Sequence, residues 1–159
     1  AYVLGAIAMG LLAGQCGRNV VAVSFAVLAM GLIGGAIASG YTVTVPYVGA
    51  TNLAAAAGVG LLVALRFPVG LTAVTGIGLL LGLAQGYSNG LAIRIDTAEV
   101  LFIAGIVGAC LSILALASAL ALAARASWQL IAVRAAGSWI AAIALIVLAL
   151  EFSPKGMPN

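Results

Sequence analysis

The chain has 159 residues, of which 65% are hydrophobic and only 6% are charged, and its formal net charge is +3. A water-soluble domain carries roughly 25% charged residues, so a soluble fold with this composition would expose large apolar patches and aggregate. The basic residues are scattered singly, which excludes the basic patch that nucleic-acid binding requires. The composition therefore predicts an all-α integral membrane bundle that forms one transmembrane domain over residues 1–159.

Six apolar segments approach the roughly 20 residues that a membrane-spanning helix needs. They are predicted at residues 1–15, 20–39, 51–65, 69–85, 98–123 and 128–150, with a polar tail over 151–159. The first segment is short for a hydrocarbon core of roughly 30 Å, and it lacks the basic region of a signal peptide. We expect that the chain begins further upstream or that this end is tucked against other helices.

The basic residues predict the orientation of the bundle. Arg18, Arg66 and Arg125 follow the first, third and fifth segments, so they lie on one side of the membrane together with Arg134. On the other side the charges nearly cancel; they are Arg94, Asp96, Glu99, Glu151 and Lys155. The positive-inside rule places the arginine side in the cytoplasm. This predicts a multi-pass protein of a bacterial-type inner membrane with both termini outside.

Two longer connections, residues 40–50 and 86–97, are expected on the outer side. They contain Tyr41, Tyr47 and Tyr87. These tyrosines are typical of an aromatic belt at the membrane interface, and the alternative is that they line an entrance on the outer face.

Glycines spaced by four residues lie on one face of a helix and allow another backbone to approach closely. Predicted packing glycines are Gly78, Gly82, Gly86 and Gly90 in the fourth segment, Gly10 and Gly14 in the first, and Gly31 and Gly35 in the second. We expect the fourth segment to be the packing centre and its Leu81 to face lipid. The two halves of the chain show only a vague likeness in glycine placement, which establishes no inverted repeat.

The residue types present exclude the usual catalytic and metal chemistry. The chain has no histidine, so it contains neither a Ser-His-Asp arrangement nor the common neutral metal ligand. Cys16 and Cys110 are predicted to be free thiols because a disulfide between them would have to cross membrane depth. Asp96 and Glu99 are expected to pair with Arg94 or to lie at a helix N-terminus. We therefore predict no enzyme activity, no catalytic residues and no metal ligands.

Polar side chains at membrane depth are costly and are candidate functional groups. The serines and threonines, among them Thr75, Ser112, Ser118 and Ser138, can bond their own helix backbone and need no further role. Gln85 and Asn89 lie four residues apart, on one helix face, beside Tyr87. They either cap the end of the fourth segment at the interface or form a modified binding site.

Several stretches of the chain resemble the HupE/UreJ family of small polytopic membrane proteins. The matching stretches are residues 6–20, 58–68, 84–90, 101–116 and 133–148. The resemblance implies a six-helix membrane fold, an accessory role in hydrogenase or urease systems, and permease activity towards nickel or cobalt.

The resemblance also locates the positions of the family's metal motifs. The family carries Asp-His before a Gly-Leu-Trp-Ala-Ala-Gln segment that matches residues 10–15, so Ala1 and Tyr2 occupy the Asp-His positions. The family's fourth helix ends in Phe-His-Gly-x-Ala-His-Gly, where this chain has Ala-Gln-Gly-Tyr-Ser-Asn-Gly. Gln85 and Asn89 therefore stand where the resemblance implies histidines. The candidate site is Tyr2, Gln85, Tyr87 and Asn89, and its metal ligands are replaced.

Two functions are compatible with these observations. The first is a permease-type scaffold that lacks the expected nickel or cobalt ligands. The second is a non-catalytic accessory or structural subunit of a larger membrane complex, such as a respiratory or photosynthetic one. Membrane lipid is the expected partner in either case and nucleic acid is not. We predict no cofactor, although a lipid or pigment between helices is compatible with the sequence.

Overall fold

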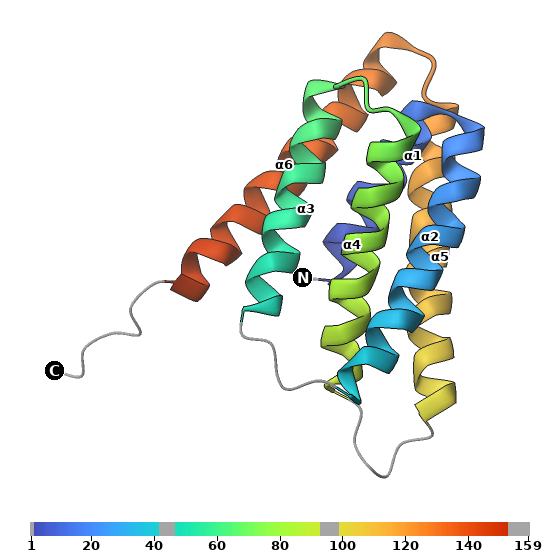
Figure 1. The fold of residues 1–159 in the computed structure, drawn as a ribbon. Helices are drawn as coiled ribbons and strands as arrows, with labels where there is room; N and C mark the ends of the chain where they lie inside the picture. Colours follow the sequence, from blue (N-terminus) through green and yellow to red (C-terminus); the bar gives the residue numbers. More distant parts are fainter. Residues whose placement is uncertain (1, 42–46, 93–98, 153–159) are drawn as a thin grey trace, which may run out of the picture.

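The computed structural model describes residues 2–41, 47–92 and 99–152, with the side chains of Tyr2 and Glu99 outside the description. It contains six helices within these residues (Figure 1). They are α1 (Tyr2–Cys16), α2 (Arg18–Ser39), α3 (Val48–Leu65), α4 (Leu71–Gly90), α5 (Glu99–Ala123) and α6 (Ser127–Phe152). The predicted all-α membrane bundle is confirmed, and five of the helices are long and apolar enough to cross a membrane.

Two helix boundaries differ from the prediction by three residues or more. Helix α3 begins at Val48 instead of residue 51, and α4 continues to Gly90 instead of ending at residue 85. The segment Gly86–Gly90 was expected in a connection, although Gly86 and Gly90 were also expected on the packing face of the fourth segment. Close packing of α4 against α2 keeps it helical, since a Cβ placed on Gly90 would lie 2.9 Å from the carbonyl oxygen of Ala36.

The turns at one end of the bundle are short and strained where glycine is absent. Only Gly17 separates α1 from α2, and its φ of 110° is a conformation that glycine adopts without steric cost. Arg66 ends α3 in the left-handed region at φ 51°. Its backbone N–H and that of Phe67 bond to carbonyl groups of the last turn of α3, which satisfies acceptors that a helix end leaves open.

Helix α1 lies at the centre of the bundle. It has 15 residues, about 22 Å at 1.5 Å per residue, and it begins inside the bundle, short of the end that α3 and α4 reach (Figure 1). Residues 8–14 are buried on all sides of the helix, with Ala8, Met9, Leu12 and Ala13 fully inaccessible, whereas Val3 in the first turn is 53% exposed. Most of this helix is therefore packed against other helices, as expected, while its first turn is partly exposed.

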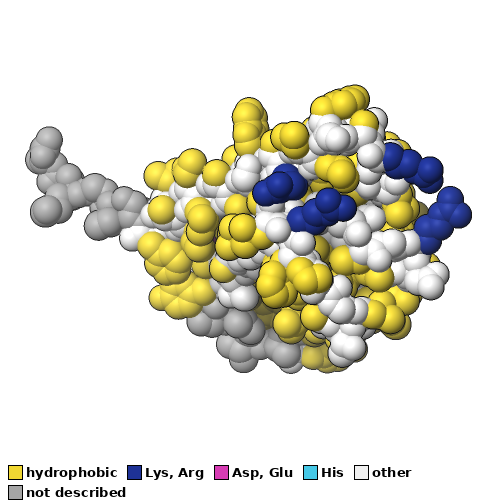
Figure 2. All heavy atoms as spheres, turned by 90° about the horizontal axis from the view of Figure 1, so that it is seen from above, with side chains coloured by type: hydrophobic (Ala, Val, Ile, Leu, Met, Phe, Trp, Pro, Cys, Tyr) yellow, Lys and Arg dark blue, Asp and Glu magenta, His cyan; other side chains and the backbone are white. Residues whose placement is uncertain are grey.

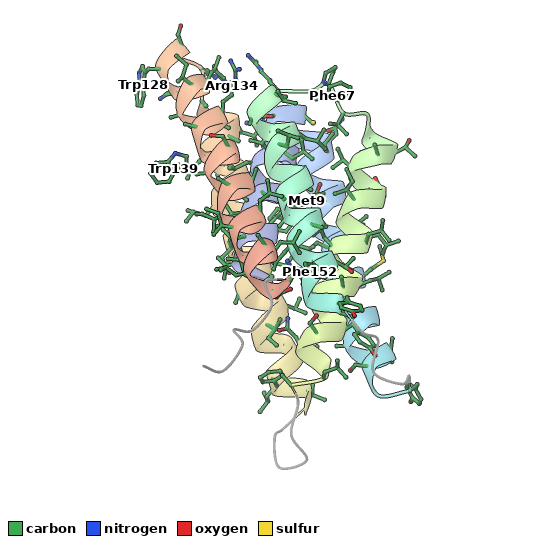
Figure 3. All side chains as sticks on the ribbon, turned by 90° about the vertical axis from the view of Figure 1, so that its left-hand side faces the viewer. Met9, Phe67, Trp128, Arg134, Trp139 and Phe152 are labelled. Carbon is green, nitrogen blue, oxygen red and sulfur yellow. The ribbon has the colours of Figure 1, made fainter. Side chains whose placement is uncertain are left out.

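Helices α5 and α6 expose apolar side chains on the outside of the bundle. Trp139 projects away from α6 and is 72% exposed, whereas Met9 points into the interior (Figure 3). Such apolar surfaces are suited to contact with lipid acyl chains, because the hydrocarbon core of a bilayer is itself apolar.

The expectation that Leu81 faces lipid is wrong. Leu81 is only 1% exposed and belongs to the buried core, whereas the neighbouring Leu80 is 68% exposed. The error arises because α4 is surrounded by α2, α1 and α3, so the glycine face is not its only buried face. Leu81 lies next to Gly5 of α1.

The arginines gather at the end of the bundle where the α1–α2, α3–α4 and α5–α6 turns lie. Seen from above, this end shows several Lys or Arg side chains and no acidic side chain among the residues described (Figure 2). Two of its polar side chains bond the end of α3: Gln15 Nε2 lies 3.3 Å from the carbonyl oxygen of Val63, and Arg134 Nε 2.9 Å from that of Ala64. Both carbonyl groups belong to the last turn of α3, where a helix leaves acceptors open, and that of Val63 also accepts from the backbone N–H of Arg66.

Candidate amide site beside helix α1

Gln85 is the most deeply buried of the predicted site residues. Its side chain is 1% exposed and extends from α4 to Gly5 in the first turn of α1. A Cβ placed on Gly5 would lie 2.5 Å from Gln85 Nε2, so the glycine makes the space that the amide occupies. The carboxamide is therefore held between α4 and the start of α1.

Asn52 is a second buried amide, on the first turns of α3. It is 3% exposed, and neither its oxygen nor its nitrogen has a hydrogen-bond partner among the residues described. Burying an amide without partners costs about 1–3 kcal/mol, so such a group calls for an explanation. The sequence analysis did not assign Asn52 to the site. The signal in the sequence that could have identified Asn52 is an amide side chain at the start of an otherwise apolar segment.

The two amides lie on α3 and α4, and both of these helices contact the start of α1. Consecutive residues of α1 contact both helices: Leu4 packs against the cluster that contains Leu53 of α3, and Gly5 packs against Gln85 of α4. Helices α3 and α4 also share a hollow of about 300 Å³ with α2. Its lining residues are Gly35, Ala38, Val48, Thr51, Leu83, Ala84 and Tyr87.

The other predicted site residues have different surroundings. Tyr87 is 8% exposed and lines the hollow between α2, α3 and α4. Asn89 lines a cavity of only about 10 Å³ against α2 and α5, next to Leu32 and Ile106. Tyr2 is the first residue of α1, and its side chain lies outside the described part. The structure thus gives Gln85, Tyr87 and Asn89 separate neighbours.

The hydroxyl groups bond their own helices, as predicted. Thr75 and Ser112 donate to the carbonyl oxygens four residues earlier, and Ser118 and Ser138 to those three residues earlier. Cys16 and Cys110 are free. No group of three or more His, Cys, Asp or Glu side chains comes together within residues 2–41, 47–92 and 99–152. Glu99 is the first residue of α5, and Arg94 and Asp96 lie outside the described residues.

Six apolar helices and an arginine-bearing end define a polytopic helical membrane protein, and two buried amides lie among its helices. A family model described as HupE / UreJ protein matches residues 2–147. The chain belongs to the HupE/UreJ family, which supports a membrane accessory role or a role of the nickel- and cobalt-transport type. No curated protein and no solved structure matches the chain.

Proposed function

We propose that this protein is a HupE/UreJ-type permease scaffold in which amides replace the imidazoles of the metal site. The observation that carries the proposal is the pair of buried amides, Asn52 of α3 and Gln85 of α4, on two helices that contact the start of α1. Polar groups at membrane depth generally lie on substrate pathways. Gln85 packs against the end of α1 at which the resemblance implies the family's Asp-His motif.

The chemistry of amides argues for an altered substrate. Nickel and cobalt sites favour imidazole or thiolate ligands, and an amide oxygen carries no charge to offset the dehydration of a divalent ion. Amides instead offer paired hydrogen-bond donors and acceptors. The site therefore suits a small polar solute better than a transition-metal ion, and we expect the purified protein to bind nickel and cobalt only at nonspecific strength. Isothermal calorimetry measures this, and micromolar nickel binding by the unmodified protein would contradict the proposal.

Replacing Asn52 with leucine tests whether this amide is kept for the fold or for a ligand. The side chains have the same number of non-hydrogen atoms and the same branching, and Asn52→Leu removes two polar atoms that have no hydrogen-bond partner among the described residues. We expect the variant to be more stable than the parent by about 1–3 kcal/mol. Thermal unfolding in detergent provides the measurement. Thr51→Leu is the matched control, because Thr51 is exposed and bonds the carbonyl oxygen of Tyr47.

A gain in stability would support a role in binding, since functional groups often persist at a cost to the fold. A clear loss of stability in Asn52→Leu would instead make the amide a structural element, and the proposed site would lose one of its two members.

We further propose that the arginine-bearing end faces the cytoplasm and that both termini lie outside. The support is the positive charge at this end (Figure 2). In a background without Cys16 and Cys110, Tyr41→Cys should react with a membrane-impermeant thiol reagent added to intact cells. Arg125→Cys should react only after the membrane is opened. Labelling of position 125 in intact cells would reverse the proposed orientation.

An accessory subunit of a larger complex is the second candidate. Helix α5 is the observation that favours it, because its long apolar span is less buried within the chain than those of α2, α3 and α4. Lipid would cover this surface equally well, and purification in mild detergent separates the two cases. Stoichiometric recovery of a second membrane protein, lost when Leu101 and Leu116 on the exposed surface of α5 are changed, would favour the subunit.

A further inference from the structure

Each of the three closest helix pairs joins one helix from the first half of the chain to one from the second. The pairs are α1 with α5, α2 with α4, and α3 with α6. In every pair a glycine brings the two backbones into contact. The first half, α1–α3, is therefore interleaved with the second half, α4–α6, and neither forms a separate bundle.

The α1–α5 pair has a contact that repeats after one turn. A Cβ placed on Gly10 would lie 2.8 Å from the carbonyl oxygen of Leu114, and one on Gly14 would lie 2.7 Å from that of Ser118. The residue three positions after each of these carbonyl-bearing residues is an alanine, and its side chain also faces the glycine.

The α4–α2 pair reproduces this contact with the same register. A Cβ on Gly82 would lie 2.8 Å from the carbonyl oxygen of Leu28, and one on Gly86 would collide with that of Leu32. These glycines lie 72 residues after Gly10 and Gly14, and Leu114 and Ser118 lie 86 residues after Leu28 and Leu32. One constant offset therefore relates α1 to α4, and another relates α2 to α5.

The α3–α6 pair is its own counterpart. A Cβ on Gly60 would lie 2.8 Å from the carbonyl oxygen of Gly137 and 2.9 Å from the nitrogen of Ala141. A Cβ on Gly137 would lie 2.8 Å from the carbonyl oxygen of Gly60 and 2.9 Å from the nitrogen of Ala64. Exchanging the two helices leaves the contact unchanged, as expected where a two-fold axis passes through it.

The directions of the helices agree with this relation. Helices α1, α3 and α5 run towards the arginine-bearing end, and α2, α4 and α6 run away from it (Figure 1). Each helix of the first half is thus related to a helix of the second half that runs in the opposite direction. The two-fold axis that relates the two halves therefore lies in the plane of the membrane. This is the arrangement of inverted-topology repeats, which transporters use to expose one site to each side of the membrane in turn.

We propose that the chain is an interleaved inverted repeat of three plus three helices, in which the arms α1/α5 and α4/α2 move against each other about the α3/α6 pair. The movement rests on the permease function proposed above. Within each arm the contacts are between backbones, which keeps the arm rigid. The α1–α4 contacts between the arms use flexible side chains: Met9 Cε faces Gly78, and Gln85 faces Gly5.

The two ends of the bundle already differ as such a movement requires. At the arginine-bearing end a hollow of about 560 Å³ reaches Val20 of α2. At the other end the cavity that contains Ile106, the counterpart of Val20 at the 86-residue offset, measures only about 10 Å³. The hollow at the arginine-bearing end is larger than both this cavity and the hollow of about 300 Å³ that Tyr87 lines, and the exchanged arrangement of the arms would reverse this difference.

Two engineered disulfides distinguish rigid arms from the moving interface. In the protein without Cys16 and Cys110, Met9→Cys with Gly78→Cys links the arms, because position 78 faces Met9 across α1 and α4. Gly34→Cys with Leu83→Cys links α2 and α4 within one arm. A Cβ on Gly34 would lie 3.5 Å from Leu83 Cδ2 and would contact no backbone atom, and a Cβ on Gly78 would likewise meet side-chain atoms only. Neither pair of cysteines therefore places a side chain between two backbones.

Amide hydrogen exchange of residues 83–90 reports opening of the end of the bundle opposite the arginines. We expect the oxidised Met9→Cys/Gly78→Cys protein to slow this exchange about ten-fold, with recovery on reduction, while the Gly34→Cys/Leu83→Cys protein exchanges at the parent rate. Equal effects of the two disulfides, or no effect of the link between the arms, would overturn the proposal. The readout needs no substrate, so a failed metal or solute assay leaves it unaffected.

Discussion

A Gly82→Leu protein should lose its folded bundle in detergent, whereas a Gly76→Leu protein should keep the stability of the parent. Both glycines lie on α4, and both changes add the same side chain. A Cβ on Gly82 would lie 2.8 Å from the carbonyl oxygen of Leu28 and 2.9 Å from Cα of Gly31, whereas one on Gly76 meets nothing within 4 Å. A leucine at position 82 must therefore separate the backbones of α2 and α4.

The expected cost is large because the contact is between backbones, which cannot repack as side chains do. Inserting even one or two methylenes into a packed interior costs about 1–3 kcal/mol, and a leucine at Gly82 should exceed the upper value. Thermal unfolding of the purified protein, followed by size-exclusion elution, provides the measurement. Similar unfolding temperatures for the two variants would show that α2 and α4 are not held together at this glycine.

The sequence predicts the number and order of the helices well because apolar length alone determines which segments enter a bilayer. It predicts the surroundings of single residues less well. Leu81 and Leu80 are chemically identical neighbours, yet one is buried and the other exposed. In a membrane protein both lipid and the interior are apolar, so hydropathy does not tell the two faces of α4 apart.

The same limit explains why the Gly60–Gly137 contact was not predicted. Small residues spaced by four occur in most segments of a chain with 21 glycines, and nothing in the spacing says which helix each will meet. The offsets that relate the halves, 72 residues for α1 and 86 for α2, differ because the connections differ in length. A search for one fixed period therefore finds only a vague likeness.

The candidate site was predicted in part. Gln85 was identified because the resemblance places it at a histidine position, and the structure shows it buried against Gly5. Asn52 was not included, because its contribution depends on how α3 lies beside α1. Asn89 follows Gln85 by four residues, but packing against α5 gives it a separate small cavity. One helical face can thus contact two different neighbours.

Restoring the family's histidines should create a nickel site on this scaffold. The variant Ala1→Asp, Tyr2→His, Gln85→His and Asn89→His returns the implied ligands to α1 and α4. We expect it to bind nickel at least about a hundred-fold more tightly than the parent, since imidazole is a far better nickel ligand than an amide. Isothermal calorimetry with nickel and with magnesium gives the affinities, and magnesium binding should stay unchanged.

The separate surroundings of Gln85 and Asn89 make the single variants informative controls. Gln85→His puts an imidazole beside the start of α1, whereas Asn89→His puts it in the cavity against α5. Each alone offers one ligand and should bind nickel weakly. The combination of Tyr2→His and Gln85→His should provide most of the gain if the site lies between α1 and α4. If Asn89→His is required for any gain, the metal position would lie nearer α5. No gain from the full set would mean that this scaffold does not bring the family's metal positions together.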